Sequence, residues 1–170
     1  MIETADLILD KARYCDWKDM YENVWSREEA ARYMYWRVTE SEEDARRRAE
    51  RSVAFQKDHD AFFIYEKSSG RAIGFAGIKN IRPGVCEESG ICLGPDYTGK
   101  GYGKQVLQAL IDLSREKYQV TSFIYKARQE NAVSRHLAES NGFSEYDREE
   151  AYDERYDQTY TLICYEKKLS

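Results

Sequence analysis

Metal-binding residue types are scarce in this chain of 170 residues. Its four cysteines include no C-x-x-C pair, and its two histidines, His59 and His136, lie far apart in the sequence. Structural zinc sites usually combine cysteine and histidine at short, regular spacings. We therefore expect no metal site, and we expect the thiols to be reduced, as is usual in the cytoplasm.

Long hydrophobic runs are also missing. The longest strongly apolar run covers residues 61–65, far fewer than the ~20 residues that cross a bilayer. Near the N-terminus, Asp6 and Asp10 interrupt a short apolar stretch, so no charged segment is followed by a signal-like apolar one. These absences predict a cytoplasmic protein that does not insert into a membrane.

The chain has no net positive charge, and proline is scarce. The formal net charge is −5, which argues against general nucleic-acid binding, because that requires a basic face. A negative chain suits a cationic partner such as an amine. The only prolines are Pro83 and Pro95, and no repeat or linker interrupts the sequence. The length is typical of one compact domain, which we expect to cover residues 1–170.

Residue patterns predict a mixed α/β fold in which helices come first, followed by an antiparallel meander, a βαβα unit and a closing strand. The predicted strands cover residues 7–9, 61–67, 71–79, 88–93, 122–126 and 160–168. The predicted helices begin after Asp16, near residue 27, after Ser41, near residue 101 and at about Asn131. Asp16 and Asn131 (or a neighbour of Asn131) are the candidate caps, and Ser41 starts its helix with a near capping box.

Three consecutive arginines occupy positions 46–48 of the helix predicted after Ser41. Each follows an acidic residue of positions 42–44 by four residues, the spacing at which helical side chains meet. A phosphate-binding patch is one interpretation of this triplet. We favour a solvated helix face, because the carboxylates cancel the positive charge.

The most informative segment joins the strand at 88–93 to the next helix through a turn that contains Gly99, Gly101 and Gly103. Glycine allows backbone N–H groups to approach an anion closely. The first turn of a helix adds unpaired N–H donors and a favourable dipole. With Lys100 and Lys104 nearby, this order predicts a pyrophosphate cradle.

Two phosphate-binding patterns fit this turn poorly. Residues 94–100 spell G-x-x-x-x-G-K, but Gly101 stands where a P-loop has the Ser or Thr that holds magnesium. The dinucleotide pattern G-x-G-x-x-G fails because the glycines at 99, 101 and 103 have the wrong spacing. A nucleotide hydrolase is therefore the third choice of function.

Residues 98–103, Thr-Gly-Lys-Gly-Tyr-Gly, resemble the acetyl-CoA signature R/Q-x-x-G-x-G/A of the GNAT N-acetyltransferase superfamily. Both glycines of the signature match, whereas Thr98 departs from its Arg or Gln. Asn131 and Ser134, followed by Asn-Gly-Phe at 141–143, resemble the second motif of the superfamily.

The N-terminal part resembles the ribosomal-protein N-acetyltransferase (RimJ/RimL-type) branch at residues 7–9, 35–36 and 41–45. Asp6 and Asp10 stand where that branch has arginines. The resemblance thus extends over nearly the whole chain, and its motifs are specific for the superfamily.

The resemblance implies a mostly antiparallel twisted sheet with flanking helices, in which acetyl-CoA lies between splayed strands at 88–93 and 122–126. Backbone groups of Ile91 and Leu93 would pair with the pantetheine, and an amide near Cys92 could polarise the thioester carbonyl. The implied coenzyme-binding residues are Ile91, Cys92, Leu93, Thr98, Gly99, Lys100, Gly101, Tyr102, Gly103, Lys104, Asn131 and Ser134.

The resemblance also implies direct attack of a neutral amine on the thioester. Glu88 occupies a plausible position for the base, although an exposed strand-start carboxylate is an equal interpretation. Relatives often have a tyrosine as acid where this chain has Ala138, so Ser134 is the nearest polar candidate. Alternatively, Ser134 serves only at the helix terminus or contacts the coenzyme. For Cys92 we favour packing over an acyl-cysteine, since no base partner is evident.

Few acid–base groups are evident in the sequence. We therefore expect an acceptor whose amine has a moderate pKa and needs little help from a base, such as a protein N-terminus or a small amine. Tyr35 and Trp36 are expected to line the amine site, with core packing as the alternative. The acidic segment 145–157 could attract a basic acceptor, but we favour a solvated hairpin.

Ala138 supports a second class of function, a non-catalytic regulator that binds acetyl-CoA. An isologous homodimer would be a common arrangement for a small enzyme of this kind.

Overall fold

All 170 residues are described by the computed structural model, in which the chain forms two compact units. The first comprises Met1–Lys79 and Ser89–Leu110, and the second comprises Asn80–Glu88 and Ile111–Ser170. That the chain is one domain stays a prediction. None of the helices combines the length and the apolar character needed to cross a membrane.

Eight strands form one open sheet in the order β1-β2-β3-β4-β5-β6-β8-β7. The registered pairs are antiparallel, except for the parallel pair of β5 with β6. The predicted mixed α/β fold with a mostly antiparallel sheet is therefore confirmed. The strands are β1 (Ile2–Glu3), β2 (Leu7–Asp10), β3 (Ala61–Glu66), β4 (Ala72–Arg82), β5 (Val85–Leu93), β6 (Ser122–Arg128), β7 (Ser144–Asp153) and β8 (Gln158–Lys168).

Five α-helices accompany the sheet, and the three longest begin close to their predicted positions. They are α1 (Trp17–Met20), α2 (Glu28–Ala31), α3 (Glu42–Lys57), α4 (Tyr102–Tyr118) and α5 (Ala132–Ser140). Short turns of other helical types cover Tyr14–Asp16, Tyr21–Trp25 and Pro95–Tyr97.

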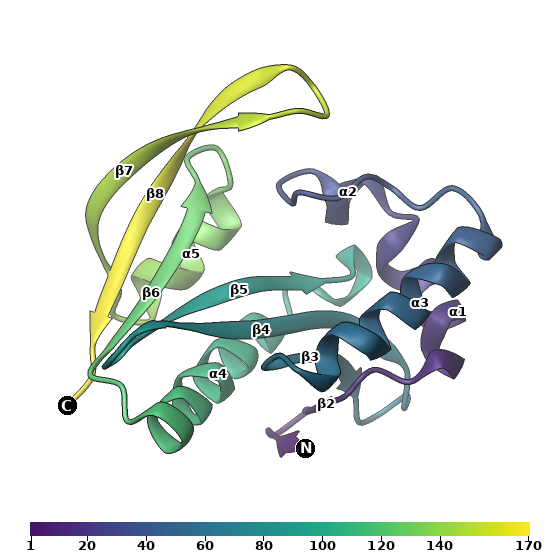
Figure 1. Cartoon of the computed structure of the whole chain (residues 1–170), viewed down its shortest axis with the longest axis horizontal. Helices are drawn as coiled ribbons and strands as arrows, with labels where there is room; N and C mark the ends of the chain where they lie inside the picture. The colour runs from purple at the N-terminus through teal and green to yellow at the C-terminus, as the bar shows by residue number, and fades with distance from the viewer. The chain divides into compact units, whose positions relative to one another are not determined.

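The core of the first unit forms where α3 packs along β3 and β4 (Figure 1). Ser41 caps the helix as predicted, because its Oγ accepts a hydrogen bond of 3.1 Å from the Asp44 amide. On the inner face, Ala45 lies in one cluster with Trp25 and Phe63, whose rings meet edge to face at 6.0 Å. Short side chains on α3 thus let the helix lie close to the aromatic residues beneath it.

The prediction for the arginine triplet was correct at two positions and wrong at the third. The pairs at 42/46 and 43/47 form, with N–O distances of 3.7 and 2.7 Å. Asp44, however, lies 3.6 Å from Arg47, and Arg48 turns inward instead of pairing with it. The reason is helical geometry, since Arg48 lies on the same stripe as the buried Ala45 and Ala49.

Asp16 precedes α1 as predicted, but its side chain makes no capping hydrogen bond. Its carboxylate is buried and accepts hydrogen bonds from the Tyr65 hydroxyl (2.7 Å) and from the Arg13 guanidinium (3.1 Å). The capping role was therefore wrong. A buried carboxylate needs charged or hydrogen-bonding partners, and here they are Tyr65 on β3 and Arg13, three positions earlier in the chain.

The hairpin of β3 and β4 was predicted, but β4 continues to Arg82 and β5 begins three residues before the predicted start at Glu88. Gly84, with φ of +81°, makes the tight turn that joins them. In the second unit, β5 then pairs with β6 in parallel over residues 85–87 against 122–124. That the two strands separate beyond this ladder stays a prediction.

β7 and β8 form a long two-stranded ribbon that curves along β6 (Figure 1). Nearly every side chain of β7 is exposed, including Tyr146 and Tyr152. The acidic segment at 145–157 is thus a solvated hairpin, as favoured, although β7 itself was not predicted as a strand.

Candidate functional site

The glycine turn between β5 and α4 has the backbone conformation that only glycine adopts easily. Gly99 and Gly101 have φ of +77° and +79°, and a Cβ added at either would meet no atom within 4 Å. The space beside the turn is therefore open to a ligand. A side chain in this space would also strain the backbone, because L-residues rarely adopt a positive φ.

The amides of this turn and of the first turn of α4 lack backbone acceptors. The first amide of the helix with such a partner is that of Gln105, which donates to the Gly101 carbonyl at 3.4 Å. The N–H groups of residues 99–104 are free to bind a ligand, and the helix dipole makes the preferred ligand an anion. Lys100 and Lys104 are exposed beside them.

A buried carboxylate holds the start of α4 in place. The Tyr102 hydroxyl donates to Glu66 at 2.7 Å, and the Ser69 hydroxyl donates to the other carboxylate oxygen at 2.8 Å. These hydrogen bonds lower the pKa of Glu66, and the one from Tyr102 has the largest effect. The same hydrogen bond raises the pKa of Tyr102 to about 12. Lys100 lies 3.8 Å from Glu66. The turn is thus anchored to the end of β3 by the side chains on either side of Gly101.

A second anchor reaches the same turn from the N-terminal residues. The Gln105 side chain donates to the Asp6 carboxylate at 2.7 Å and accepts from the Asp6 amide at 3.1 Å and the Thr4 hydroxyl at 2.6 Å. Asp6, which departs from the arginine of the resembled branch, therefore positions α4. The Thr98 hydroxyl donates to the Pro95 carbonyl at 2.9 Å and so stabilises the turn itself.

Cys92 is buried on β5, and its thiol lies 3.8 Å from the Ala30 carbonyl. Burial raises the pKa of the thiol to about 12, although the nearby Arg48 opposes this shift. Such a thiol is almost entirely protonated at neutral pH and is a poor nucleophile. The geometry therefore favours the packing role for Cys92.

The aromatic residues predicted to line the amine site have different environments. Tyr35 is 76% exposed. Trp36 packs against the edge of the core, with its ring 6.5 Å from that of Phe75 and 4.3 Å from the guanidinium carbon of Arg48. Trp36 can thus both pack against the core and bind a ligand, and its substrate role stays a prediction.

In the second unit, Glu88, Tyr125 and Ser134 form one cluster. The Tyr125 and Ser134 hydroxyls are 2.6 Å apart. Tyr125 is buried, and burial, followed by the negative charge of Glu88, raises its pKa. Tyr125 therefore keeps its proton and can donate it in a hydrogen bond to Ser134. By contrast, the Glu87 carboxylate lies 3.2 Å from Lys126.

Asn131 caps α5, because its side-chain oxygen accepts a hydrogen bond of 3.2 Å from the Ser134 amide. This cap orients the first turn of α5, which carries the Ser134 hydroxyl. Sequence reasoning missed Tyr125, although its position on the strand just before the second motif was a usable signal. It also missed Glu66, a carboxylate that ends the most apolar run of the chain.

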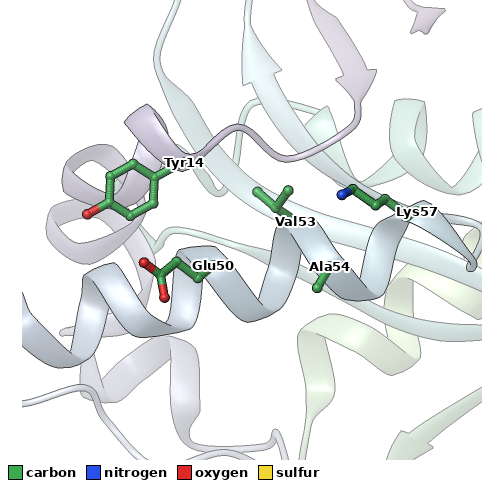
Figure 2. A pocket seen from close by; sticks show the side chains of 5 residues that line it. All are labelled: Tyr14, Glu50, Val53, Ala54 and Lys57. Carbon is green, nitrogen blue, oxygen red and sulfur yellow. The ribbon is translucent and has the colours of Figure 1, made fainter.

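A shallow hollow on the outer side of α3 contains none of the predicted site residues (Figure 2). Its lining consists of Tyr14, Glu50, Val53, Ala54 and Lys57. Elsewhere, no group of three or more His, Cys, Asp or Glu side chains is arranged to hold a metal ion. The glycine turn and the Glu88 cluster are therefore the stronger candidates.

Residues 6–144 match the family model described as an acetyltransferase (GNAT) domain. No curated protein matches the sequence.

Three solved structures resemble this fold over 98% of the chain. An acetyltransferase (GNAT family) from Bacillus anthracis has 19% identity, a TM-score of 0.81 and 97% of its own length covered. The ribosomal L7/L12 alpha-N-protein acetyltransferase RimL, in complex with coenzyme A, has 19% identity, a TM-score of 0.79 and 96% covered. The Microcin C7 self immunity acetyltransferase MccE, in complex with acetyl-CoA and AMP, has 18% identity, a TM-score of 0.82 and 94% covered.

The burial of three of the four cysteines predicts selective labelling. Cys15 is exposed, whereas Cys86, Cys92 and Cys164 are buried. At pH 8, a thiol with a pKa of about 12 is ionised in only about one molecule in ten thousand. Iodoacetamide should therefore modify Cys15 alone in the native protein and all four cysteines in denaturant. Peptide mass analysis that found rapid native labelling of Cys92 would contradict its packing role.

Proposed function

The chain belongs to the GNAT acetyltransferase family, and from this premise we propose that it transfers the acetyl group of acetyl-CoA directly to a primary amine. The acceptor is a protein N-terminus or a small-molecule amine. The observation that carries the proposal is the glycine turn, with open space beside it and unpaired amides at residues 99–104. RimL, named for its action on a ribosomal protein, supports an amine acceptor.

The first unit supplies the proposed coenzyme contacts. The amides of residues 99–103 bind the pyrophosphate, and Lys100 and Lys104 add positive charge. The strand backbone at Ile91 and Leu93 binds the pantetheine as an added strand would, and an amide near Cys92 polarises the thioester carbonyl. Among the other predicted coenzyme residues, Thr98 and Tyr102 act by shaping the backbone, because their side chains are engaged within the chain. In the second unit, Asn131 likewise acts by capping α5.

The second unit supplies the proposed acid–base groups. The amine nitrogen attacks the thioester carbonyl carbon, and Glu88 accepts the proton that the nitrogen loses. The C–S bond then breaks and the sulfur leaves as a thiolate. A thiol has a pKa of about 8.5, so its thiolate is a fair leaving group near neutral pH and can take a proton from solvent.

Ser134 stabilises this departing thiolate through a hydrogen bond. A serine hydroxyl has one proton, which it can give to the sulfur only if it is not already donating elsewhere. In this proposal Tyr125 ensures this by acting as the donor of the 2.6 Å hydrogen bond between the two hydroxyls, in which either oxygen could donate. The raised pKa of Tyr125 keeps its proton available for this hydrogen bond throughout the reaction.

A screen of amines with acetyl-CoA tests the proposed function. The panel should contain peptides with free N-termini, amino acids, polyamines and aminoglycosides, and the readouts should be release of thiol and the mass of the product. We expect one class of amine to gain a single acetyl group. Tight acetyl-CoA binding without thiol release for any amine would instead support a non-catalytic, acetyl-CoA-binding regulator.

Gly101→Val should weaken acetyl-CoA binding by about tenfold or more, which corresponds to at least about 1.4 kcal/mol. The valine side chain would occupy the open space at the turn, and its φ of +79° would strain the backbone. Gly84→Val is the matched control, because Gly84 has φ of +81° in a turn that lacks the proposed role. Calorimetry showing equal affinity for the folded Gly101 variant and the unaltered protein would exclude the cradle.

Glu88→Gln should slow acetylation by about 10²- to 10⁴-fold at low pH. The loss should shrink as the pH rises, because a larger share of the amine is then neutral without help from a base. Glu87→Gln serves as the control, since the carboxylate of Glu87 pairs with Lys126. A pH–rate profile for Glu88→Gln that superimposes on that of the unaltered enzyme would remove Glu88 from the mechanism.

Ser134→Ala should lower kcat by about ten- to hundredfold with little change in the KM for acetyl-CoA, because it removes a hydrogen bond to a developing charge. Tyr125→Phe keeps the packing against Phe143 and should produce a smaller loss of the same kind. Ser140→Ala, on the same helix, should have no effect. A rise in KM without a fall in kcat would instead assign Ser134 to coenzyme binding.

A further inference from the structure

Arg48 has an environment unlike that of any other arginine with a shifted pKa. Its guanidinium carbon lies 4.9 Å from the ring centre of Trp25 and 4.3 Å from that of Trp36. One nitrogen donates to the Thr39 hydroxyl at 3.2 Å. No carboxylate lies within ion-pair distance, because Asp44, four residues earlier, pairs with Arg47. The cation is therefore partly buried without a counter-charge.

The pKa directions agree with this geometry. Burial, opposed by Cys92 and aided by the positive charge of Arg51, lowers the pKa of Arg48 to about 10. For comparison, carboxylate partners raise the pKa values of Arg13, Arg27 and Arg71. Removing a cation from water without a partner costs desolvation free energy. We therefore infer that the unpaired guanidinium of Arg48 has a functional role.

The indole rings also restrict how Arg48 can bind a partner. The rings of Trp25 and Trp36 lie against the guanidinium, with its carbon over each ring, and Thr39 uses a single N–H group. The remaining donors lie in the guanidinium plane, where their fork matches the two oxygens of a carboxylate. Thr39 therefore leaves N–H donors of Arg48 available for a planar anion such as a carboxylate.

Arg48 lies beside both parts of the first unit that were assigned to the reaction. It is close enough to Cys92 for each to shift the pKa of the other, and Cys92 belongs to the strand proposed to bind the thioester. On its other side is Trp36, the proposed wall of the amine site. A ligand that contacts Trp36 and approaches the thioester therefore passes close to this guanidinium.

We propose that Arg48 binds a carboxylate carried by the amine acceptor, so that the substrate class is amines that also bear a carboxylate, such as amino acids and acidic peptides. The inference rests on the proposed function, because it concerns the same acceptor site. Arg48 selects the substrate by pairing with its anionic group, and it takes no part in proton transfer. An acceptor without the carboxylate leaves the guanidinium uncompensated and binds more weakly.

Matched acceptors that differ only in the carboxylate test the proposal. Alanine is compared with alaninamide, and alanyl-glutamate is compared with alanyl-glutamine, each by kcat/KM at saturating acetyl-CoA. In at least one pair, the acid should be preferred by about ten- to hundredfold, the usual effect of a hydrogen bond to a charged group. Arg48→Met should abolish this preference, whereas Arg48→Lys should keep part of it because the charge remains.

Arg51→Gln is the control, since Arg51 is exposed one turn along the same helix and should leave the preference unchanged. Thermal melts of each variant separate loss of the fold from loss of selectivity. A structural role alone would lower the melting temperature and change both members of a pair equally. No preference in the unaltered enzyme, or a preference that survives Arg48→Met, would overturn the inference while leaving the acetyltransferase function intact.

If no amine in the wider screen is acetylated, the proposed function fails, and binding still decides the role of Arg48. Calorimetry with the acid and amide ligands in the presence of CoA then provides the comparison. Binding of the acid member alone, lost in Arg48→Met, would support the carboxylate site. Equal binding of both members would exclude it.

Discussion

The hydrogen bond from Tyr102 to Glu66 is the contact on which the glycine turn depends. Glu66 ends an apolar strand, and its buried carboxylate meets Tyr102, the first residue of α4, which lies between Gly101 and Gly103. Glycine gives the turn its conformation but also lets it adopt many others, so the turn needs an anchor to stay open. Because the pKa of Glu66 is lowered, the carboxylate remains charged in the folded chain and keeps this anchor across the neutral range.

The pH dependence of this anchor follows from the direction of that shift. A carboxyl group whose pKa is lower in the folded chain stabilises the fold at every pH above its unfolded value. That contribution disappears as the pH falls through the folded pKa, when Glu66 gains a proton and no longer accepts from both Tyr102 and Ser69. Loss of order at the turn is thus confined to acidic conditions, whereas raising the pH from neutral leaves the Glu66 side of the contact unchanged.

Local features of this fold could be predicted from the sequence, and long-range partners could not. The caps at Ser41 and Asn131 and the glycine turn each depend on a few adjacent residues, and all are present as predicted. Asp16 and Arg48 were misjudged because the Asp16 carboxylate accepts from Tyr65 and Arg13 and not from a helix amide, whereas Arg48 contacts two indole rings and not Asp44. Helical spacing predicted a salt bridge for Arg48, but the burial of its stripe of α3 decided otherwise.

Only part of the candidate site could be predicted for the same reason. The coenzyme turn is a continuous segment, whereas the proposed hydroxyl pair joins a strand to the next helix. Ala138, at the position where the resembled superfamily often has a tyrosine, is completely buried. A tyrosine ring would not fit there without displacing the core around α5. In the proposed mechanism the hydrogen bond to the leaving thiolate therefore comes from another side chain, and Ser134, oriented by Asn131 and Tyr125, is the hydroxyl that the fold of the second unit holds in a fixed position.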